Sequence, residues 1–245
     1  MTRTALVTGA ARGIGLATVK LFLRDGLHVI MVDNDEDALS QAAADLENVT
    51  TLPCDVSDAE AVATLAAGVD RVDALVNNAG LADFGPIEET TFDRWRRVMA
   101  TNLDGVFLMT QAFTPHLKDT KGAIVNIASI SALRASTLRV AYGTSKAGVA
   151  HLTQQQAVEL GEYGIRANCV CPGPVRTKLA MAVHTQDIID AYHDAIPLNR
   201  YGQEVEIAEA IVWLCSSKAS FVTGQRLAVD GGFESTGIGL PSLRA

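Results

Sequence analysis

Lysine and arginine are scarce in this sequence of 245 residues: 20 of them stand against 28 aspartates and glutamates, which gives a formal net charge of −8 at pH 7. A surface that binds nucleic acid or anionic lipid needs a clustered excess of basic side chains. The composition therefore predicts neither nucleic acid nor a membrane as a partner. A small molecule is the partner that we expect instead.

Long apolar runs are missing as well. No stretch approaches the roughly 18 consecutive apolar residues of a membrane-spanning helix. The amino terminus, Met1-Thr-Arg-Thr4, leads directly into a short strand-like segment. It lacks the long apolar run and cleavage site of a signal peptide. We expect a cytoplasmic protein.

Cysteine is rare, with four residues at positions 54, 169, 171 and 215. Only Cys169 and Cys171 are close in sequence, and their spacing places them on one face of a strand. No second pair completes a metal-binding set. We expect no metal site, and all four cysteines as reduced packing residues.

What the sequence does contain is a regular alternation of short apolar segments and segments with helical periodicity. Strands are expected at residues 4–8, 28–32, 49–53, 73–76, 123–127, 166–171 and 226–229. Helices are expected at residues 13–24, 35–46, 58–67, 91–115 and 204–216, with another opened by Tyr142. This alternation predicts a Rossmann-type α/β fold: one doubly wound domain over residues 1–245, with a parallel sheet of about seven strands and helices on both faces. A substrate-binding helical insert is expected around residues 178–200, with its helix at 178–193.

A glycine-rich loop follows the first expected strand, in the stretch Thr8-Gly-Ala-Ala-Arg-Gly-Ile-Gly15. Glycine permits a tight turn and close backbone approach, and the start of the following helix offers free N–H groups and a positive dipole end to a pyrophosphate. The Gly-x3-Gly-x-Gly spacing differs from the common G-x-G-x-x-G, but the strand–loop–helix context is that of a dinucleotide site. A purely structural glycine turn is the alternative. The residues expected to bind cofactor here are Gly9, Arg12, Gly13, Ile14 and Gly15.

Asp33 ends the second expected strand, about 20 residues beyond this loop. A carboxylate there can accept hydrogen bonds from the adenosine ribose hydroxyls and would repel a 2′-phosphate. We therefore expect NAD rather than NADP, although Arg12 could hold a 2′-phosphate. The acidic residues 35–37 are expected to cap the next helix.

Tyr142 and Lys146 lie four residues apart in an expected helix, so a phenol and an ammonium become neighbours on one face. The alternative is an exposed pair on an ordinary helix. Other polar groups follow strands one after another: Cys54-Asp-Val56, Asn77-Asn-Ala-Gly80 and Ser129. The carboxyl ends of parallel strands share one edge of the sheet, where ligands of such folds bind.

In order and spacing, these motifs resemble the short-chain dehydrogenase/reductase family, and the similarity extends through Pro172-Gly-Pro-Val-Arg-Thr177 to Val229-Asp-Gly-Gly232. The resemblance implies a catalytic tetrad of Asn102, Ser129, Tyr142 and Lys146, of which Tyr142 and Lys146 also contact cofactor. It implies further cofactor contacts from Asp55, Val56, Asn77, Ala79, Gly80, Pro172, Gly173, Val175 and Thr177. It also implies a homotetramer, with the Tyr142 helix and the last strand at interfaces. Structural roles remain open for Asn102 as a helix cap or kink, for Ser129 in a turn and for Asn77 as a backbone bridge.

A phenol with a reference pKa of about 10 is a poor base at neutral pH. We expect Lys146 and the oxidised nicotinamide to lower the pKa of Tyr142, by about two to three units if the differential stabilisation is about 3–4 kcal/mol. Ser129 would hold the substrate oxygen, Lys146 would also bind the nicotinamide ribose, and Asn102 would position a water that links Lys146 to solvent.

The expected activity is NAD-dependent hydride transfer between the cofactor and a small secondary alcohol or ketone of the polyol, sugar or hydroxy acid class. Substrate specificity is expected from residues 81–88, 130–141 and 179–198. The second of these segments contains Arg134 and Arg139, which either bind a carboxylate of the substrate or lie on the surface. Two alternatives remain: an NADPH-dependent 3-oxoacyl thioester reductase and a nucleotide sensor without catalysis.

Overall fold

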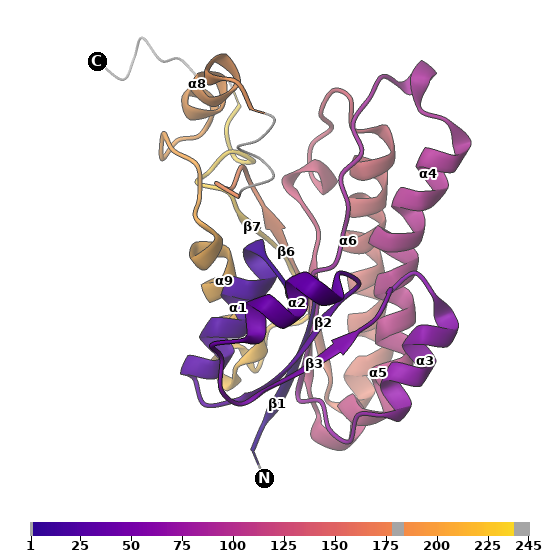
Figure 1. Ribbon diagram of the computed structural model, residues 1–245. Coiled ribbons are helices and arrows are strands. Elements are labelled where there is room, and N and C mark those ends of the chain that lie inside the picture. The colour runs from indigo at the N-terminus through magenta and orange to yellow at the C-terminus, as the bar shows by residue number, and fades with distance from the viewer. Residues whose placement is uncertain (1, 178–183, 238–245) are drawn as a thin grey trace.

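The strands of the computed structural model, which describes residues 2–177 and 184–237, form one parallel sheet in the order β3-β2-β1-β4-β5-β6-β7 (Figure 1). Their bounds are β1 Thr4–Thr8, β2 His28–Asp33, β3 Val49–Pro53, β4 Ala74–Asn77, β5 Ala123–Ile127, β6 Arg166–Pro172 and β7 Arg226–Val229. The order reverses direction between β1 and β4, which is where doubly wound folds bind their ligands. The predicted seven-stranded α/β fold is confirmed.

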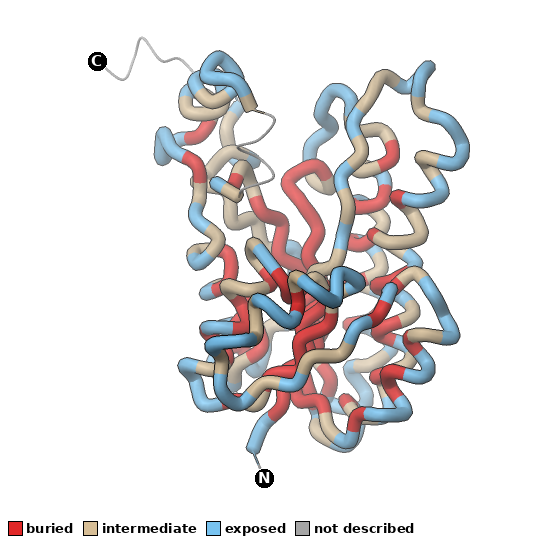
Figure 2. The backbone as a smooth tube through the Cα atoms, viewed as in Figure 1, coloured by how far each residue is buried: buried red, intermediate tan, exposed pale blue. Residues whose placement is uncertain are grey.

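Helices cover both faces of the sheet. Their bounds are α1 Gly13–Arg24, α2 Glu36–Ala43, α3 Ala59–Ala67, α4 Phe92–Met99, α5 Gly105–Thr120, α6 Val140–Leu160, α8 Gln186–Ala195 and α9 Glu204–Cys215. Short turns are η1 Ile87–Glu89, η2 Ala100–Asp104, η3 Ile130–Ala132, η4 Gly161–Tyr163 and η5 Ser217–Ala219. Buried residues run through the sheet between the two helical layers (Figure 2).

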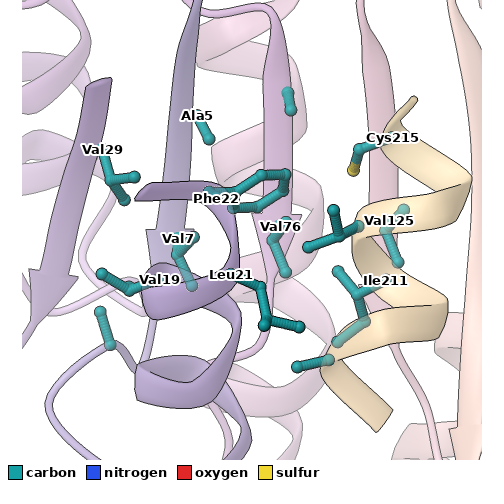
Figure 3. Close-up of a cluster of buried hydrophobic side chains, with 14 of the residues drawn as sticks. Ala5, Val7, Val19, Leu21, Phe22, Val29, Val76, Val125, Ile211 and Cys215 are labelled. Carbon is teal, nitrogen blue, oxygen red and sulfur yellow. The ribbon is translucent and has the colours of Figure 1, made fainter. Parts of the chain in front are cut away.

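The two apolar cores follow from the alternation of side chains along each strand. On β1, Ala5 and Val7 face the core that contains α1, α2 and α9, whereas Leu6 faces the core that contains α3 and α5. Figure 3 shows the first core, which includes Leu21 and Phe22 of α1 and Ile211 of α9. A third cluster packs α6 on β6.

The expected helix at residues 91–115 was wrong in two respects. It divides into α4 and α5, joined by the π-helical turn η2, and α5 continues past Pro115 to Thr120. Proline removes a helical hydrogen bond, but Phe113 and Leu117 are fully buried on either side of it, so packing holds the helix together. The helix expected at 35–46 ends earlier, at Ala43. Of the expected insert, α8 is described, while residues 178–183 lie outside the described part of the chain.

Candidate active site

The glycine loop is tied to the loop that follows β4. Thr8 Oγ1 accepts hydrogen bonds of 3.0 Å from the backbone N–H groups of Asn78 and Ala79. Asn78 Nδ2 donates in return to the carbonyls of Thr8 and Gly9, both at 3.0 Å. The adjoining ends of β1 and β4 are thereby joined at the point where the sheet order reverses. The sequence analysis missed the role of Asn78, although it noted the Asn77–Gly80 motif.

Two glycines of this loop, Gly9 and Gly15, lie where a side chain would not fit. Gly9 has a φ of +62°, and a Cβ there would lie 2.8 Å from Asn78 Nδ2, while a Cβ at Gly15 would collide with the carbonyl of Gly9. Arg12 is the N-cap residue of α1 but makes no side-chain capping bond, so the first N–H groups of α1 are not covered by a cap. A bare backbone cradle at a helix N-terminus fits a pyrophosphate.

Asp33 is fixed beside the loop. Its Oδ2 accepts a hydrogen bond of 3.1 Å from the Ala11 N–H, and its Oδ1 accepts one of 3.1 Å from the Asp35 N–H. Arg12 forms an ion pair with Asp35. Asp35 is also the N-cap of α2, as predicted, and its hydrogen bond from the Ala38 N–H, followed by the contact with Arg12, lowers the pKa of its carboxyl.

Asp55 and Val56 follow β3 at the same edge of the sheet. Asp55 Oδ1 accepts hydrogen bonds from the Ser57 N–H at 2.9 Å and from the Ser57 hydroxyl at 2.7 Å. Val56 is buried against α5, where a Cβ at Gly105 would lie 2.8 Å from Val56 Cγ2. Their contact with adenine stays a prediction.

Asn77 belongs to a buried polar network between the sheet and its helices. Its Nδ2 donates to Asn126 Oδ1 at 2.8 Å and to Thr110 Oγ1 at 3.3 Å. Asn126 donates to Thr153 and Gln156 at 2.8 Å each, and Gln156 returns to Thr110 at 3.0 Å. The side chain of Asn77 thus supports β4 through buried hydrogen bonds, and its predicted place beside the adenine ribose stays a prediction.

Asn102 is completely buried in the π-helical turn η2. Its Oδ1 accepts from the Leu81 N–H at 2.8 Å, and its Nδ2 donates to the Leu81 carbonyl at 2.9 Å and to Ser145 Oγ at 3.1 Å. A Cβ at Gly80 would lie 3.2 Å from Asn102 Oδ1 and 3.3 Å from Lys146 Nζ. Asn102 therefore anchors the loop after β4 next to Lys146, and Gly80 leaves room for that approach.

Ser129, Tyr142 and Lys146 come together at the carboxyl ends of β5 and β6. Lys146 is buried and donates from Nζ to the Ile127 carbonyl at 2.7 Å; the same Nζ lies 5.9 Å from the centre of the Tyr142 ring. The Ser129 hydroxyl interacts with the Tyr142 side chain and favours the lower pKa of the phenol. The predicted convergence of these three side chains is what the fold produces.

The electrostatics differ from the expectation. Burial raises the pKa of Tyr142, and the groups that oppose this are the Ser129 hydrogen bond and the positive charge of Arg139. Burial also lowers the pKa of Lys146 to about 8. The expected lowering of the Tyr142 pKa is therefore not seen in the protein by itself, in which Lys146 Nζ is directed at the Ile127 carbonyl. The expected combined effect of Lys146 and the oxidised nicotinamide stays a prediction.

The segment after β6 is pinned by backbone contacts. The Gly173 N–H donates to the Val229 carbonyl at 3.1 Å, and a Cβ at Gly173 would lie 2.6 Å from Asp230 Cβ. Val175 is buried and forms a parallel bridge with Gly202. These contacts hold Pro172–Thr177 at the sheet edge; its cofactor contacts stay predictions.

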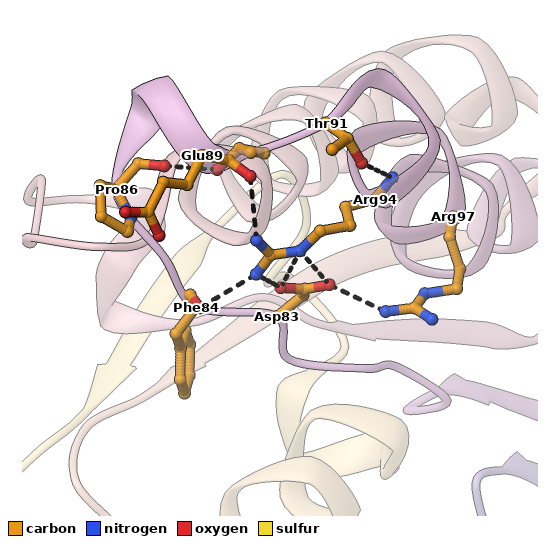
Figure 4. A network of polar contacts seen from close by, with 8 residues as sticks. Asp83, Phe84, Pro86, Glu89, Thr91, Arg94 and Arg97 are labelled. Atoms are coloured by element: carbon orange, nitrogen blue, oxygen red, sulfur yellow. Dashed lines mark hydrogen bonds and ion pairs between the residues drawn. The ribbon is translucent and has the colours of Figure 1, made fainter.

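The loop after β4 forms another wall. Asp83 pairs with Arg94 and Arg97 of α4, and Arg94 also donates to the Phe84 carbonyl at 3.0 Å (Figure 4). The Phe84 ring points away from this network and meets the Tyr142 ring edge-on, with centroids 5.9 Å apart. The sequence analysis missed this ion-pair cluster, whose only signal was the i, i+3 spacing of Arg94 and Arg97.

Aromatic side chains gather beside α8. His184 Nδ1 lies 2.9 Å from the Tyr201 hydroxyl and its ring stacks on Tyr192 with centroids 5.6 Å apart. Burial raises the pKa of Tyr201 to about 12. The expected specificity segment 179–198 contains His184 and Tyr192, but the sequence analysis did not predict their contacts with Tyr201.

The cysteines are buried free thiols, as predicted, with Cys169 and Cys171 Sγ atoms 3.9 Å apart. Within residues 2–177 and 184–237, no cluster of three or more His, Cys, Asp or Glu side chains is arranged to hold a metal ion. None of the helices in that part of the chain has the length and apolar character needed to cross a membrane.

Known proteins share this architecture. The family model described as enoyl-(acyl carrier protein) reductase matches residues 9–234. Meso-2,3-butanediol dehydrogenase of Serratia marcescens is 36% identical, with 94% of each chain covered. A short-chain type dehydrogenase/reductase from Mycobacterium ulcerans superposes with a TM-score of 0.92 at 32% identity, covering 95% of this chain and 90% of that one.

A gluconate 5-dehydrogenase from Burkholderia cenocepacia, solved in complex with NADP and tartrate, also superposes with a TM-score of 0.92, at 33% identity and 96% coverage of both chains. Matches of this extent and identity confirm the similarity inferred from the motifs. The chain belongs to the short-chain dehydrogenase/reductase family, oxidoreductases that use a nicotinamide cofactor.

Proposed function

We propose that this protein is an NAD-dependent dehydrogenase that interconverts a small secondary alcohol and the corresponding ketone. The observation that carries the proposal is the convergence of Ser129 and the buried Lys146 on Tyr142, at the sheet edge that also holds the bare glycine loop. The relative from Serratia marcescens is named for oxidation of a diol, and the neighbour from Burkholderia cenocepacia for oxidation of a sugar acid.

The residues fit a dinucleotide. The N-terminus of α1 and Gly9, Gly13 and Gly15 would hold the pyrophosphate, and Asp33 would accept hydrogen bonds from the adenosine ribose. Lys146 would hold the nicotinamide ribose hydroxyls, and Pro172–Thr177 the carboxamide. When bound, the oxidised nicotinamide supplies the hydride acceptor and a positive charge near the phenol.

NAD is the proposed cofactor because the Asp33 carboxylate is held at the loop, where it would repel a 2′-phosphate. Arg12, the cation that could favour NADP, is paired with Asp35. The neighbour from Burkholderia cenocepacia binds NADP in its crystal, so the two cofactors have to be compared directly.

Tyr142 acts as the proton acceptor in alcohol oxidation. Ser129 donates a hydrogen bond to the substrate oxygen, which holds the carbinol against the phenol and stabilises charge on that oxygen. Because burial disfavours the phenolate, Tyr142 needs nearby positive charge. Among the described residues, Lys146 Nζ and Arg139 Cζ each lie 5.9 Å from the centre of its ring. In ketone reduction Tyr142 returns the proton. Asn102 positions the Leu81 loop and a water beside Lys146.

A screen of diols, polyols, sugars and hydroxy acids with NAD and with NADP, followed by the absorbance of the reduced nicotinamide, tests this function. Tyr142→Phe is expected to lower kcat by about 10³-fold or more while NADH still binds nearly as tightly, because the ring remains and only the proton carrier is lost. Full activity in Tyr142→Phe would remove the phenol from the acid/base role. Binding of NADH without turnover of any carbonyl compound would favour a nucleotide sensor.

A second candidate is an NADPH-dependent 3-oxoacyl thioester reductase, which the description of the matching family model favours. The same absorbance assay distinguishes the two functions. A higher kcat/KM for reduction of an acyl thioester with NADPH than for reduction of any small ketone with NADH would favour the thioester reductase.

The proposal includes a cytoplasmic homotetramer. Four buried free thiols suit a reducing compartment.

A shallow depression of about 560 Å³ lies between α5 and α6, lined in part by Leu103, Phe107 and Leu152. Phe107 and Val158 of these helices are 48% and 79% exposed, which is a large apolar exposure for a surface without a partner.

A further inference from the structure

The two arginines of residues 130–141 have different surroundings. Arg134 is exposed, and its Nη1 donates to the carbonyls of Phe233 at 2.7 Å and Thr236 at 3.1 Å. Its guanidinium also lies 5.4 Å from the centre of the Phe233 ring. Arg134 is thus engaged with the segment after β7.

Arg139 instead lies beside Tyr142. Its Cζ is 4.4 Å from the centre of the Phe84 ring and 5.9 Å from the centre of the Tyr142 ring. The Phe84 and Tyr142 rings meet edge-on, so the guanidinium, the phenyl ring and the phenol form one compact group. Arg139 is half-buried.

The backbone imposes this position. Leu138 has a φ of +63°, an uncommon value for a branched side chain, and its carbonyl accepts a 2.9 Å hydrogen bond from the Gly85 N–H. Arg139 itself forms a parallel bridge with Gly85. The loop that carries Phe84 is in turn held by the Asp83–Arg94 ion pair (Figure 4).

Within residues 2–177 and 184–237, no ion pair balances the charge of Arg139. Asp83, in the adjoining loop, is taken by Arg94 and Arg97. Burial raises the pKa of Tyr142 and Arg139 opposes that rise; burial lowers the pKa of His184 and Arg139 lowers it further. The positive charge of Arg139 therefore acts on both the Tyr142 phenol and the His184 imidazole.

A guanidinium stacked on a ring keeps its N–H edge available, and that edge matches a carboxylate in a bidentate pair. We propose that Arg139 binds the carboxylate of the substrate, so that the physiological substrate is a short hydroxy acid whose carbinol group lies at Tyr142 and Ser129. This inference rests on the proposed function, because it assigns the substrate class of the same site.

The test compares 2-hydroxy and 3-hydroxy acids with their primary amides, which are neutral and nearly isosteric. Arg139→Gln is expected to lower kcat/KM for the preferred acid by about 100-fold more than it lowers kcat/KM for the amide, because the loss of positive charge near Tyr142 affects both substrates alike and only the acid also loses a bidentate partner. Arg139→Lys keeps the charge but loses the fork, so an intermediate value is expected. Arg134→Gln is the matched control and should leave both substrates unchanged.

A readout without turnover of the acid uses propanoate, a carboxylate with no hydroxyl group to oxidise. It should inhibit oxidation of a neutral diol competitively in the parent protein and about tenfold less strongly in Arg139→Gln. Circular dichroism and NADH binding verify that Arg139→Gln is folded. If it is not, the activity of Arg139→Lys and the inhibition of the parent protein by propanoate test whether Arg139 binds a carboxylate.

Equal losses on acid and amide, or a parent protein that prefers the amide, would overturn the inference. A parent protein that oxidises neutral diols but no acid would overturn it and leave the proposed function standing. A parent protein that oxidises no alcohol with either cofactor would remove the proposed function itself.

Discussion

Tyr142 is placed by residues from three separate parts of the chain. Ser129 follows β5, Lys146 lies one turn further along α6, and Phe84 comes from the loop after β4. Burial raises the pKa of the phenol. Alcohol oxidation needs the phenolate and should accelerate as pH rises through that pKa, whereas ketone reduction needs the phenol and should slow down.

Ser129→Ala should move the rising limb of the pH profile for alcohol oxidation to higher pH. The Ser129 hydrogen bond is the leading influence that lowers the pKa of Tyr142, so its loss makes the phenolate harder to form. The measurement is kcat/KM for the alcohol at saturating NAD, over a pH range that extends above the ordinary phenol pKa of about 10. Ser131→Ala, which keeps the backbone N–H that binds Ser129 Oγ, should leave the limb in place; equal shifts in both variants would contradict the assignment.

Asp33→Asn should weaken the preference for NAD over NADP by about tenfold or more, because a neutral amide removes the repulsion of a 2′-phosphate. The amide keeps one oxygen, so it can accept from only one of the two N–H groups, of Ala11 and Asp35, that the carboxylate binds. The ratio of kcat/KM values for the two cofactors measures it. Asp37→Asn, an equal charge change in the first turn of α2, is the control. A parent protein that prefers NADP would refute the assignment of Asp33.

At the scale of elements, the junction of α4 and α5 shows how one irregular turn serves the site. The π-helical turn η2 brings the Asn102 side chain inward, where it binds both backbone groups of Leu81 and the Ser145 hydroxyl. Such turns inside helices are frequent at functional sites. The next helix, α5, contributes Thr110 to the buried network beneath β4.

Thr110→Val should destabilise the fold by about 2–4 kcal/mol. The change is nearly isosteric, but it leaves the amide donors of Asn77 and Gln156 without their shared acceptor in a buried place. Thr114→Val, on the same helix, removes only a hydroxyl that bonds back to the Thr110 carbonyl and should cost less than about 0.5 kcal/mol. Urea denaturation at one protein concentration compares them; similar midpoints would show that the network contributes little.

At the scale of the whole molecule, the parallel strand order gathers residues that are far apart in sequence. The order reverses between β1 and β4, so the glycine loop and Asn77–Gly80 become neighbours, and β5 and β6 bring Ser129 and Pro172–Thr177 to the same edge. The proposed cofactor and proton-transfer groups therefore share one edge of the sheet.

Light scattering should give a mass of about four times the 25.9 kDa chain. The exposed apolar side chains of α5 and α6 are the proposed contact, so Phe107→Asp, which would place a charge in that interface, should lower the mass. Ile87→Asp, an equally drastic change at a 72% exposed side chain of η1, is the control. A monomeric parent protein would refute the tetramer.

Strands and most helices could be predicted because apolar periodicity and glycine positions are local properties: β1, β3, β5, β7 and α1 have the bounds that the sequence predicts. The continuation of α5 past Pro115 could not, since it depends on how Phe113 and Leu117 pack on the sheet. The residue types and spacing of Ser129, Tyr142 and Lys146 were likewise visible in the sequence.

The sequence alone thus determined the individual strands, the glycine loop and the Tyr142–Lys146 pair, because each depends on residues that are near one another in sequence. Only the tertiary structure decided that Asn77 supports β4 from a buried network, that burial raises the pKa of Tyr142, and that Arg139 lies beside the phenol while Arg134 binds backbone carbonyls. Desolvation and charge pairing depend on residues that chain folding brings together, which no local pattern records.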